Sequence, residues 1–111
     1  DSGVLNFYYS TNGNGHAGAK TVGSVSNGTW YHFAASRTGN TLETYLAGTR
    51  GASIDVTGIS LYDAGGLVEI GGYHTAGFDL NGHLACVRVT KGVGRYTGAS
   101  IISPTLPMPT S

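Results

Sequence analysis

Short runs of apolar and β-branched residues alternate with turn dipeptides along the whole chain. Asn27-Gly28 and Gly39-Asn40 are two such dipeptides, and both residue types tolerate the positive φ that tight hairpins require. Short strands separated by turns at this spacing are typical of an antiparallel sandwich or barrel. The pattern therefore predicts strands over residues 4–11, 21–26, 29–37, 41–47, 53–56, 59–62, 67–71 and 83–90.

The run 29–37 is the best candidate for a central strand. Successive side chains of a strand point to opposite faces, and both faces of this run carry apolar groups. We therefore expect burial on both sides and assign Trp30 to the core. His32 lies in the same run, and we expect it to have a satisfied core or cross-strand role.

The run 83–90 predicts a further strand, because Val87 and Val89 share one face with the other odd-numbered positions. Leu84 breaks this alternation, which suits a bulge near the start of the strand. Cys86 is the only cysteine of the chain, so no intrachain disulfide can form. A single cysteine in an apolar strand predicts packing rather than chemistry.

The chain is expected to form one domain followed by a short tail. Pro104, Pro107 and Pro109 mark an extended segment that can be neither helical nor central in a sheet. No internal linker separates the preceding residues into two units. We therefore predict a β-sandwich over residues 1–103 and a proline-rich tail over residues 104–111.

The composition narrows the function classes. Among 111 residues, 19 are Gly and 12 are charged, in equal numbers of each sign. Long helices and coiled coils need more Ala, Glu, Lys and Leu than this chain supplies. Zero formal net charge argues against nucleic acid as a partner, because phosphate neutralisation needs a basic surplus. No run approaches the roughly 18 apolar residues of a membrane helix, so we expect no membrane insertion.

Two stretches together carry a family resemblance. Residues 28–34 (GTWYHFA), followed by 37–42 (RTGNTL) and 45–48 (YLAG), resemble the middle hairpin of laminin-G-like, concanavalin A-like domains. Residues 87–97 (VRVTKGVGRYT) resemble the end of the same domain, in a form familiar from bacteriophage virion proteins. The resemblance implies an all-β fold, an antiparallel β-sandwich of the jelly-roll, concanavalin A-like kind.

The chain departs from the family pattern in three places. The first strand usual in the family is not found before residue 28, so we expect either a short version of the sandwich, truncated at its N-terminal side, or a fragment whose N-terminal strands lie elsewhere. The hairpin aspartate of the family is Ala47 here, and its acidic pair is replaced by Ala85 and Cys86. Carboxylates are the oxygen ligands that calcium prefers, so their loss disfavours calcium, and we expect no cofactor.

Catalysis and metal binding are both disfavoured by the residues present. Glycoside hydrolysis needs two carboxyl groups that face one cleft. The two glutamates, Glu43 and Glu69, stand 26 residues apart in the sequence, and we predict no catalytic residues and no enzyme. His74 and His83 have a spacing that matches no standard zinc motif, so no metal site is predicted.

Aromatic and polar residues in or beside the predicted loops form a candidate sugar site. An aromatic ring can cover the apolar face of a sugar while amides and carboxylates bind its hydroxyl groups. The alternative, that these are ordinary loop residues, stays open. Near the next turn, Arg88 and Arg95 are expected to brace the backbone by hydrogen bonds to carbonyls or to an acidic partner. The candidate sugar-binding residues are Tyr62, Asp63, Tyr73, His74, Asp79 and Asn81.

The expected function is a non-catalytic structural or adhesion module of a bacteriophage particle. It would be a capsid decoration or a tail-fibre or spike domain on the virion surface, with other virion proteins as partners. Symmetric assembly implies a homo-oligomer, and a trimer suits a fibre. The first alternative is a lectin-like receptor-recognition domain that binds a host-surface glycan, and the distant one is a fragment of a glycoside hydrolase. An adhesion domain from a cellular organism also stays open.

Overall fold

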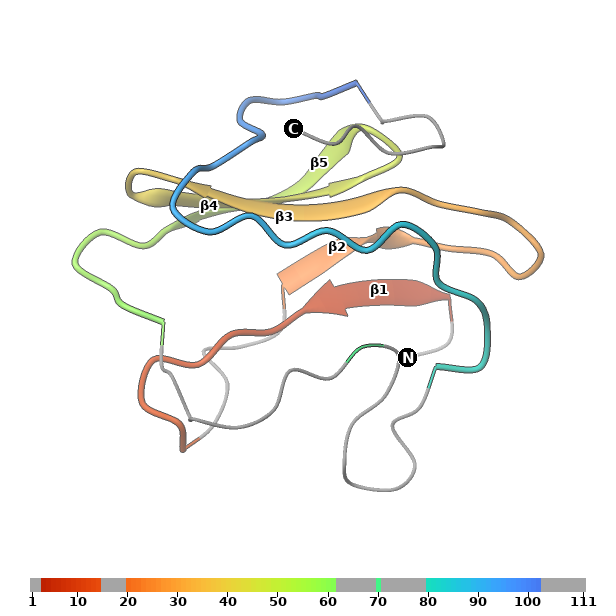
Figure 1. Cartoon of the computed structure of the whole chain (residues 1–111), viewed down its shortest axis with the longest axis horizontal. Helices are drawn as coiled ribbons and strands as arrows, with labels where there is room; N and C mark the ends of the chain where they lie inside the picture. The colour runs from red at the N-terminus through yellow and green to blue at the C-terminus, as the bar shows by residue number, and fades with distance from the viewer. Residues whose placement is uncertain (1–2, 15–19, 62–69, 71–79, 103–111) are drawn as a thin grey trace.

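A computed structural model describes residues 3–14, 20–61, 70 and 80–102. Every regular element in these ranges is a β-strand, and the strands form two antiparallel sheets that lie face to face (Figure 1). The fold is therefore all-β, an antiparallel β-sandwich, as predicted. In order along the chain, the strands are β1 (Val4–Phe7), β2 (Lys20–Ser24), β3 (Phe33–Thr38), β4 (Thr41–Leu46) and β5 (Thr49–Asp55).

Two tight hairpins build the larger sheet, whose strand order is β3-β4-β5. Gly39 begins the first two-residue turn with a φ of 59°, the conformation that a type II′ turn requires at this position. Ala47 and Gly48 form the second turn with φ values of 51° and 86°, as a type I′ turn requires at both positions. These turns match the right-handed twist of the strands and fix their register.

Strand β4 is the centre of the molecule, because both of its faces are covered. On one face Leu42 and Leu46 point toward the smaller sheet, formed by β1 and β2. On the other face, residues 94–101 cross the sheet from the end of β3 to the β4–β5 turn. The hydroxyl of Tyr45, which is fully buried, donates to the carbonyl of Gly98 at 3.0 Å. The buried apolar core consists of Val22, Leu42, Tyr45, Leu46 and Val56.

The two sheets contact each other at a pair of β-bulges. Val22 is the extra residue of β2 opposite β1, and Gly51 is the extra residue of β5 opposite β4. The backbone of Val22 lies so close to Gly51 that a Cβ atom at position 51 would overlap it. The hydroxyl of Thr44 accepts a hydrogen bond from the amide of Ala52, which holds the bulged strand in place. Glycine at position 51 thus sets the distance between the sheets.

The prediction for the run 29–37 was wrong in two respects. Strand β3 begins only at Phe33, and it is an edge strand rather than the central one. Trp30 is 69% exposed, so it is not a core residue. Alternation shows which side chains share a face, but it cannot show which faces other elements cover. The predicted strand 53–56 corresponds to the end of β5, which begins earlier, at Thr49, whereas residues 59–61 form no strand.

Residues 83–90 form no strand, contrary to the prediction. The segment runs beside β3 without backbone hydrogen bonds to it (Figure 1). Cys86 has a φ of 55° and is exposed, so its predicted packing role is also wrong, and Leu84 marks no bulge. The predicted strand 67–71 and the tail 104–111 lie outside the described residues, apart from Ile70. In the part of the chain that is described, no helix has the length and apolarity of a membrane span.

Candidate functional site

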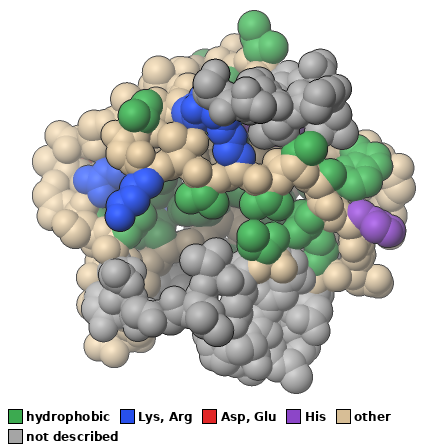
Figure 2. Space-filling view, viewed as in Figure 1, with side chains coloured by type: hydrophobic (Ala, Val, Ile, Leu, Met, Phe, Trp, Pro, Cys, Tyr) green, Lys and Arg blue, Asp and Glu red, His purple; other side chains and the backbone are tan. Residues whose placement is uncertain are grey.

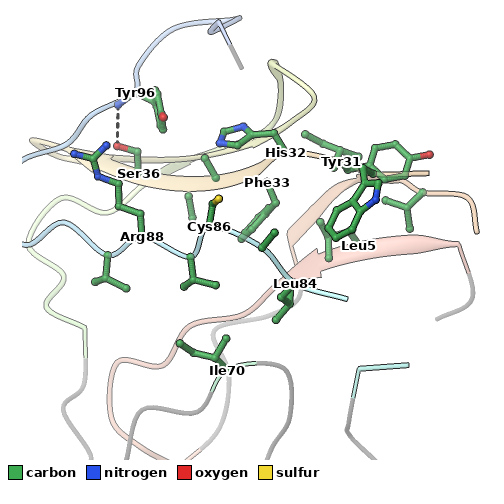
Figure 3. A pocket seen from close by; sticks show the side chains of 18 of the residues that line it. Leu5, Tyr31, His32, Phe33, Ser36, Ile70, Leu84, Cys86, Arg88 and Tyr96 are labelled. Atoms are coloured by element: carbon green, nitrogen blue, oxygen red, sulfur yellow. Dashed lines mark hydrogen bonds between the residues drawn. The ribbon is translucent and has the colours of Figure 1, made fainter. Parts of the chain in front are cut away.

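An open groove lies between strand β3 and the segment 80–96. Its volume is about 1670 Å³, larger than the roughly 300–1,000 Å³ of an ordinary small-molecule pocket. Apolar side chains gather across the middle of this face of the molecule (Figure 2). Phe33 from β3, with Leu84 and Cys86 from the opposite wall, lies around the same cavity (Figure 3). We call this feature the β3 groove.

The walls of the β3 groove expose unusually large apolar side chains. Trp30 and Phe33 line one side, and Leu84, Val87 and Val89 line the other. Each is at least 44% exposed, and Val89 reaches 84%. Monomeric proteins rarely expose contiguous apolar patches of more than a few hundred Å² unless the patch binds something. The groove is therefore the leading candidate for a binding surface.

One wall of the groove is the edge of β3 that pairs with no other strand among the described residues. The amide of Ala47 donates to the carbonyl of His32 at 2.9 Å, and the pairing with β4 continues through Thr38. Because backbone groups of an antiparallel pair alternate in direction, Phe33, Ala35 and Arg37 turn theirs away from β4. Among the described residues, no backbone group hydrogen-bonds to these three on the groove side, although Gly94 packs directly against the carbonyl of Arg37.

Polar contacts close one end of the groove. The amide of Tyr96 donates to the hydroxyl of Ser36 at 3.2 Å (Figure 3). Arg95 donates from its Nε to the hydroxyl of Thr90 at 2.9 Å. Arg95 thus braces the turn between residues 90 and 95, as predicted, although this contact is to a hydroxyl rather than to a carbonyl or an acid. Arg88 also lines the groove, and Figure 3 shows its side chain beside Ser36.

His32 stands just before β3, at the groove and against Tyr96. The two rings meet edge to face, with centroids 6.1 Å apart. Its Nδ1 atom is buried and has no hydrogen-bond partner in the described structure, so the predicted satisfied role is only partly correct. Burial lowers the pKa of His32 below its ordinary value of 6.5, which favours the neutral imidazole at pH 7.

Glu43 lies on the other side of the sheet from the β2-facing core and is held by several donors. It is 3% exposed, and its carboxylate accepts from Arg50 at 2.9 Å and from Thr97 at 3.1 Å. Burial raises its pKa, but the hydrogen bonds from Arg50, Thr97 and the Gly98 backbone outweigh burial and lower the pKa overall. The hydrogen bonds from Thr97 and from the Gly98 backbone attach residues 97–98 to the sheet, so Glu43 has a structural role.

Of the six predicted sugar-binding residues, only Asn81 can be placed. It is exposed and lines the β3 groove. The other five lie outside the described residues, so the predicted site stays a prediction: Tyr62, Asp63, Tyr73, His74 and Asp79. His83 also lines the groove, but no group of three or more potential metal ligands occurs among the residues that the structure describes.

The sequence interpretation missed the role of Arg37, although the residue lies in the motif RTGNTL. Its guanidinium donates to the carbonyls of Gly39, Ile59 and Val56 at 3.2, 2.8 and 3.4 Å. These bonds join the β3–β4 turn to the loop that follows β5. The signal in the sequence was an arginine two residues before the glycine of a turn. A guanidinium at such a place can donate to several carbonyls at once.

Comparison with known protein families gives one match. A laminin G-type family model, described as the concanavalin A-like lectin/glucanases superfamily, matches residues 1–93. The matched range covers β1 to β5 and most of both walls of the β3 groove. Searches of curated proteins and of solved structures found no significant match.

Proposed function

Because the chain belongs to the concanavalin A-like lectin/glucanases superfamily, and this membership supports a carbohydrate-binding or adhesion-type module, we propose a finer role. In this proposal the chain is a non-catalytic adhesion module on the surface of a bacteriophage particle. It attaches to other virion proteins as a capsid decoration or as part of a tail fibre or spike. A homo-oligomer, and a trimer in a fibre, is part of the proposal.

The exposed apolar lining of the β3 groove carries the proposal. Side chains such as Val87 and Val89 contact water at a free-energy cost of about 25 cal/mol for each Å² of apolar surface. A protein partner that covers them removes this cost, as the apolar centre of an interface does. The zero net charge of the chain fits such contacts, because no strong field repels neighbouring copies.

The absence of catalysis rests on the carboxylates. Among the described residues that line the groove, none is Asp or Glu. Glu43 is buried in its ion pair with Arg50, and it does not belong to the groove lining. A glycosidase mechanism needs an acid and a second carboxylate facing one substrate, and the described groove supplies neither. The particle-borne role is supported by the resemblance of residues 87–97 to virion proteins.

Site-specific photo-crosslinking tests this proposal. A benzophenone amino acid replaces Val89 in the groove, and in a control chain it replaces Ser60, which is exposed but outside the groove. After irradiation of purified phage particles that carry the chain, we expect Val89 to give defined crosslinks to virion proteins and Ser60 to give few. Absence of the chain from the particles, or equal crosslinking at the two positions, would contradict the proposal.

A second function, glycan recognition, is favoured by Trp30. Its indole is 69% exposed at the groove, and the amides of Asn27 and Asn81 belong to the same lining. An exposed aromatic face with nearby amides suits a sugar ring. On a glycan array, we expect saturable binding that Trp30→Ala abolishes and Tyr8→Ala retains, since Tyr8 is half exposed but lies outside the groove lining. Equal binding by both variants would exclude this site.

A further inference from the structure

Asparagine is followed directly by glycine at several places in the chain, and this pair is chemically reactive. The backbone nitrogen of the glycine can attack the side-chain amide carbon of the asparagine and close a five-membered ring. Glycine favours the attack, because it has no side chain to obstruct the ring and its backbone reaches conformations that other residues avoid. All three asparagines of the pairs that lie wholly within the described residues are exposed, so exposure does not distinguish them: Asn12-Gly13, Asn27-Gly28 and Asn81-Gly82.

Two hydrogen bonds protect the Asn12-Gly13 pair. The amide of Gly13, which is the group that would attack, donates to the hydroxyl of Ser10 at 2.9 Å. The side-chain oxygen of Asn12 accepts from the amide of Asn14 at 2.9 Å, and this bond restrains the rotation that ring closure needs. Both bonds have to break before the ring can form, so we expect a slow reaction at this pair.

The other two pairs lack such protection. Among the described residues, neither the amides of Gly28 and Gly82 nor the side chains of Asn27 and Asn81 make a hydrogen bond. The space around the glycines is also open. Apart from chain neighbours, no atom lies within 4 Å of the place that a Cβ atom would take at Gly28, and at Gly82 the nearest is a Leu80 side-chain atom at 3.8 Å. Both attacking nitrogens are therefore accessible.

Both unprotected pairs border the β3 groove. Asn27-Gly28 lies in the loop between β2 and β3, and Asn81-Gly82 lies on the opposite wall. None of the described lining residues is acidic. Conversion of these amides to carboxylates would add the first negative charges to the described lining. It would also replace a group that can donate hydrogen bonds by one that only accepts them.

We propose that Asn27 and Asn81 are sites of spontaneous deamidation, a self-modification that places carboxylates in the β3 groove. The glycine nitrogen loses its proton to solvent and bonds to the asparagine Cγ, while the Cγ–Nδ2 bond breaks and the amide nitrogen leaves as ammonia with a proton from water. Water then opens the succinimide ring at either carbonyl, which gives aspartate or isoaspartate. Each product is ionised at neutral pH, so two conversions take the formal net charge from 0 to −2.

Peptide mass spectrometry of the full chain measures the reaction at each position. The folded protein is kept at neutral pH and 37 °C, and samples are digested in acid, where the glycine nitrogen keeps its proton. Fragment spectra separate Asn12 from Asn14. A protecting hydrogen bond is worth a factor of about five in rate, so we expect Asn27 and Asn81 to react at least fivefold faster than Asn12. Equal rates, or a faster reaction at Asn12, would overturn the inference.

Ser10→Ala tests the assigned protection. It removes the acceptor of the Gly13 amide, so we expect Asn12 to deamidate at least threefold faster while the rates at the groove stay unchanged. Ser60→Ala is the matched control, because it removes an exposed hydroxyl that lies outside the groove and leaves the Gly13 contact intact. If Asn12 reacted no faster in Ser10→Ala than in Ser60→Ala, the hydrogen bond would not be what protects it.

Unfolding in urea separates the effect of the fold from that of the local sequence. The three pairs consist of the same two residues, so we expect their rates to agree within about twofold once the protecting bonds are lost. A slow Asn12 in urea would mean that flanking residues set the rates, and the inference would be overturned. The inference does not rest on the proposed function, because the reaction needs no partner. Missing crosslinks from Val89 would therefore contradict the particle-borne role and leave deamidation standing.

Discussion

Ala47 occupies a backbone conformation that its side chain disfavours. It is the first residue of the type I′ turn between β4 and β5, with a φ of 51°. The left-handed region costs an ordinary L-residue about 1–2 kcal/mol, whereas Asn adopts it readily. We predict that Ala47→Asn raises the free energy of unfolding by about 0.5–1 kcal/mol, measured by urea denaturation. Ala34→Asn, in β3 at negative φ, should give no gain. A less stable Ala47→Asn would contradict the assigned turn.

Glu43 makes the stability of the protein depend on pH in a defined direction. Its folded-state pKa lies below the ordinary value of 4.5, so the unfolded chain takes up a proton first as the solution is acidified. The stabilisation is therefore present above pH 4.5 and is lost as the pH falls through the folded-state pKa. We predict that Glu43→Gln lowers stability by about 1–3 kcal/mol at pH 7.

The same substitution should flatten the decline of stability in acid, as seen by urea denaturation at several pH values. Asp55→Asn is the comparison, because it leaves the Glu43–Arg50 pair intact. Hydrogen bonds from Thr57 also lower the pKa of this exposed carboxyl, so we expect Asp55→Asn to flatten the decline less than Glu43→Gln does. If Glu43→Gln and the wild type lost stability in parallel from pH 6 to pH 3, Glu43 would not be the group responsible.

At the scale of elements, the contact between the bulges of β2 and β5 sets the separation of the sheets. A Cβ atom at Gly51 would overlap the backbone of Val22, which cannot rotate away as a side chain can. We predict that Gly51→Ala lowers the free energy of unfolding by about 1–3 kcal/mol. Gly82→Ala is the matched control, because the nearest atoms there belong to the Leu80 side chain at 3.8 Å. Thermal unfolding of both variants measures the difference, and equal losses would contradict the role of the bulge contact.

The strands also show how much of the fold can be predicted from the sequence. The hairpins β3-β4 and β4-β5 are predictable, because turn type depends on local residues such as Gly39-Asn40 and because the strands are neighbours in sequence. The predictions of a strand at 83–90 and of a buried Trp30 were wrong. Strand pairing and side-chain burial both depend on segments that are distant in the sequence. Of the predicted sugar site, the structure places only Asn81, and no periodicity indicates that the groove lies beside an unpaired edge of β3.

At the scale of the whole molecule, the described sandwich is well packed around β4 and open at β3. Tyr45, Val56 and Thr44 are almost completely buried, whereas the groove side chains are not. The core therefore supplies the stability, and the groove is the part of the molecule that remains available for a partner. Adhesion by the groove depends on the outer edge of β3 being uncovered, and no strand of the described residues pairs with it.

Backbone amide hydrogen exchange along β3 tests this central claim most directly. In the isolated chain, we predict fast exchange at Phe33, Ala35 and Arg37, whose amides point into the groove, and slow exchange at Ala34 and Ser36, which pair with β4. Slow exchange at all five residues in the isolated chain would mean that this edge of β3 is already paired, and it would contradict an open groove beside β3.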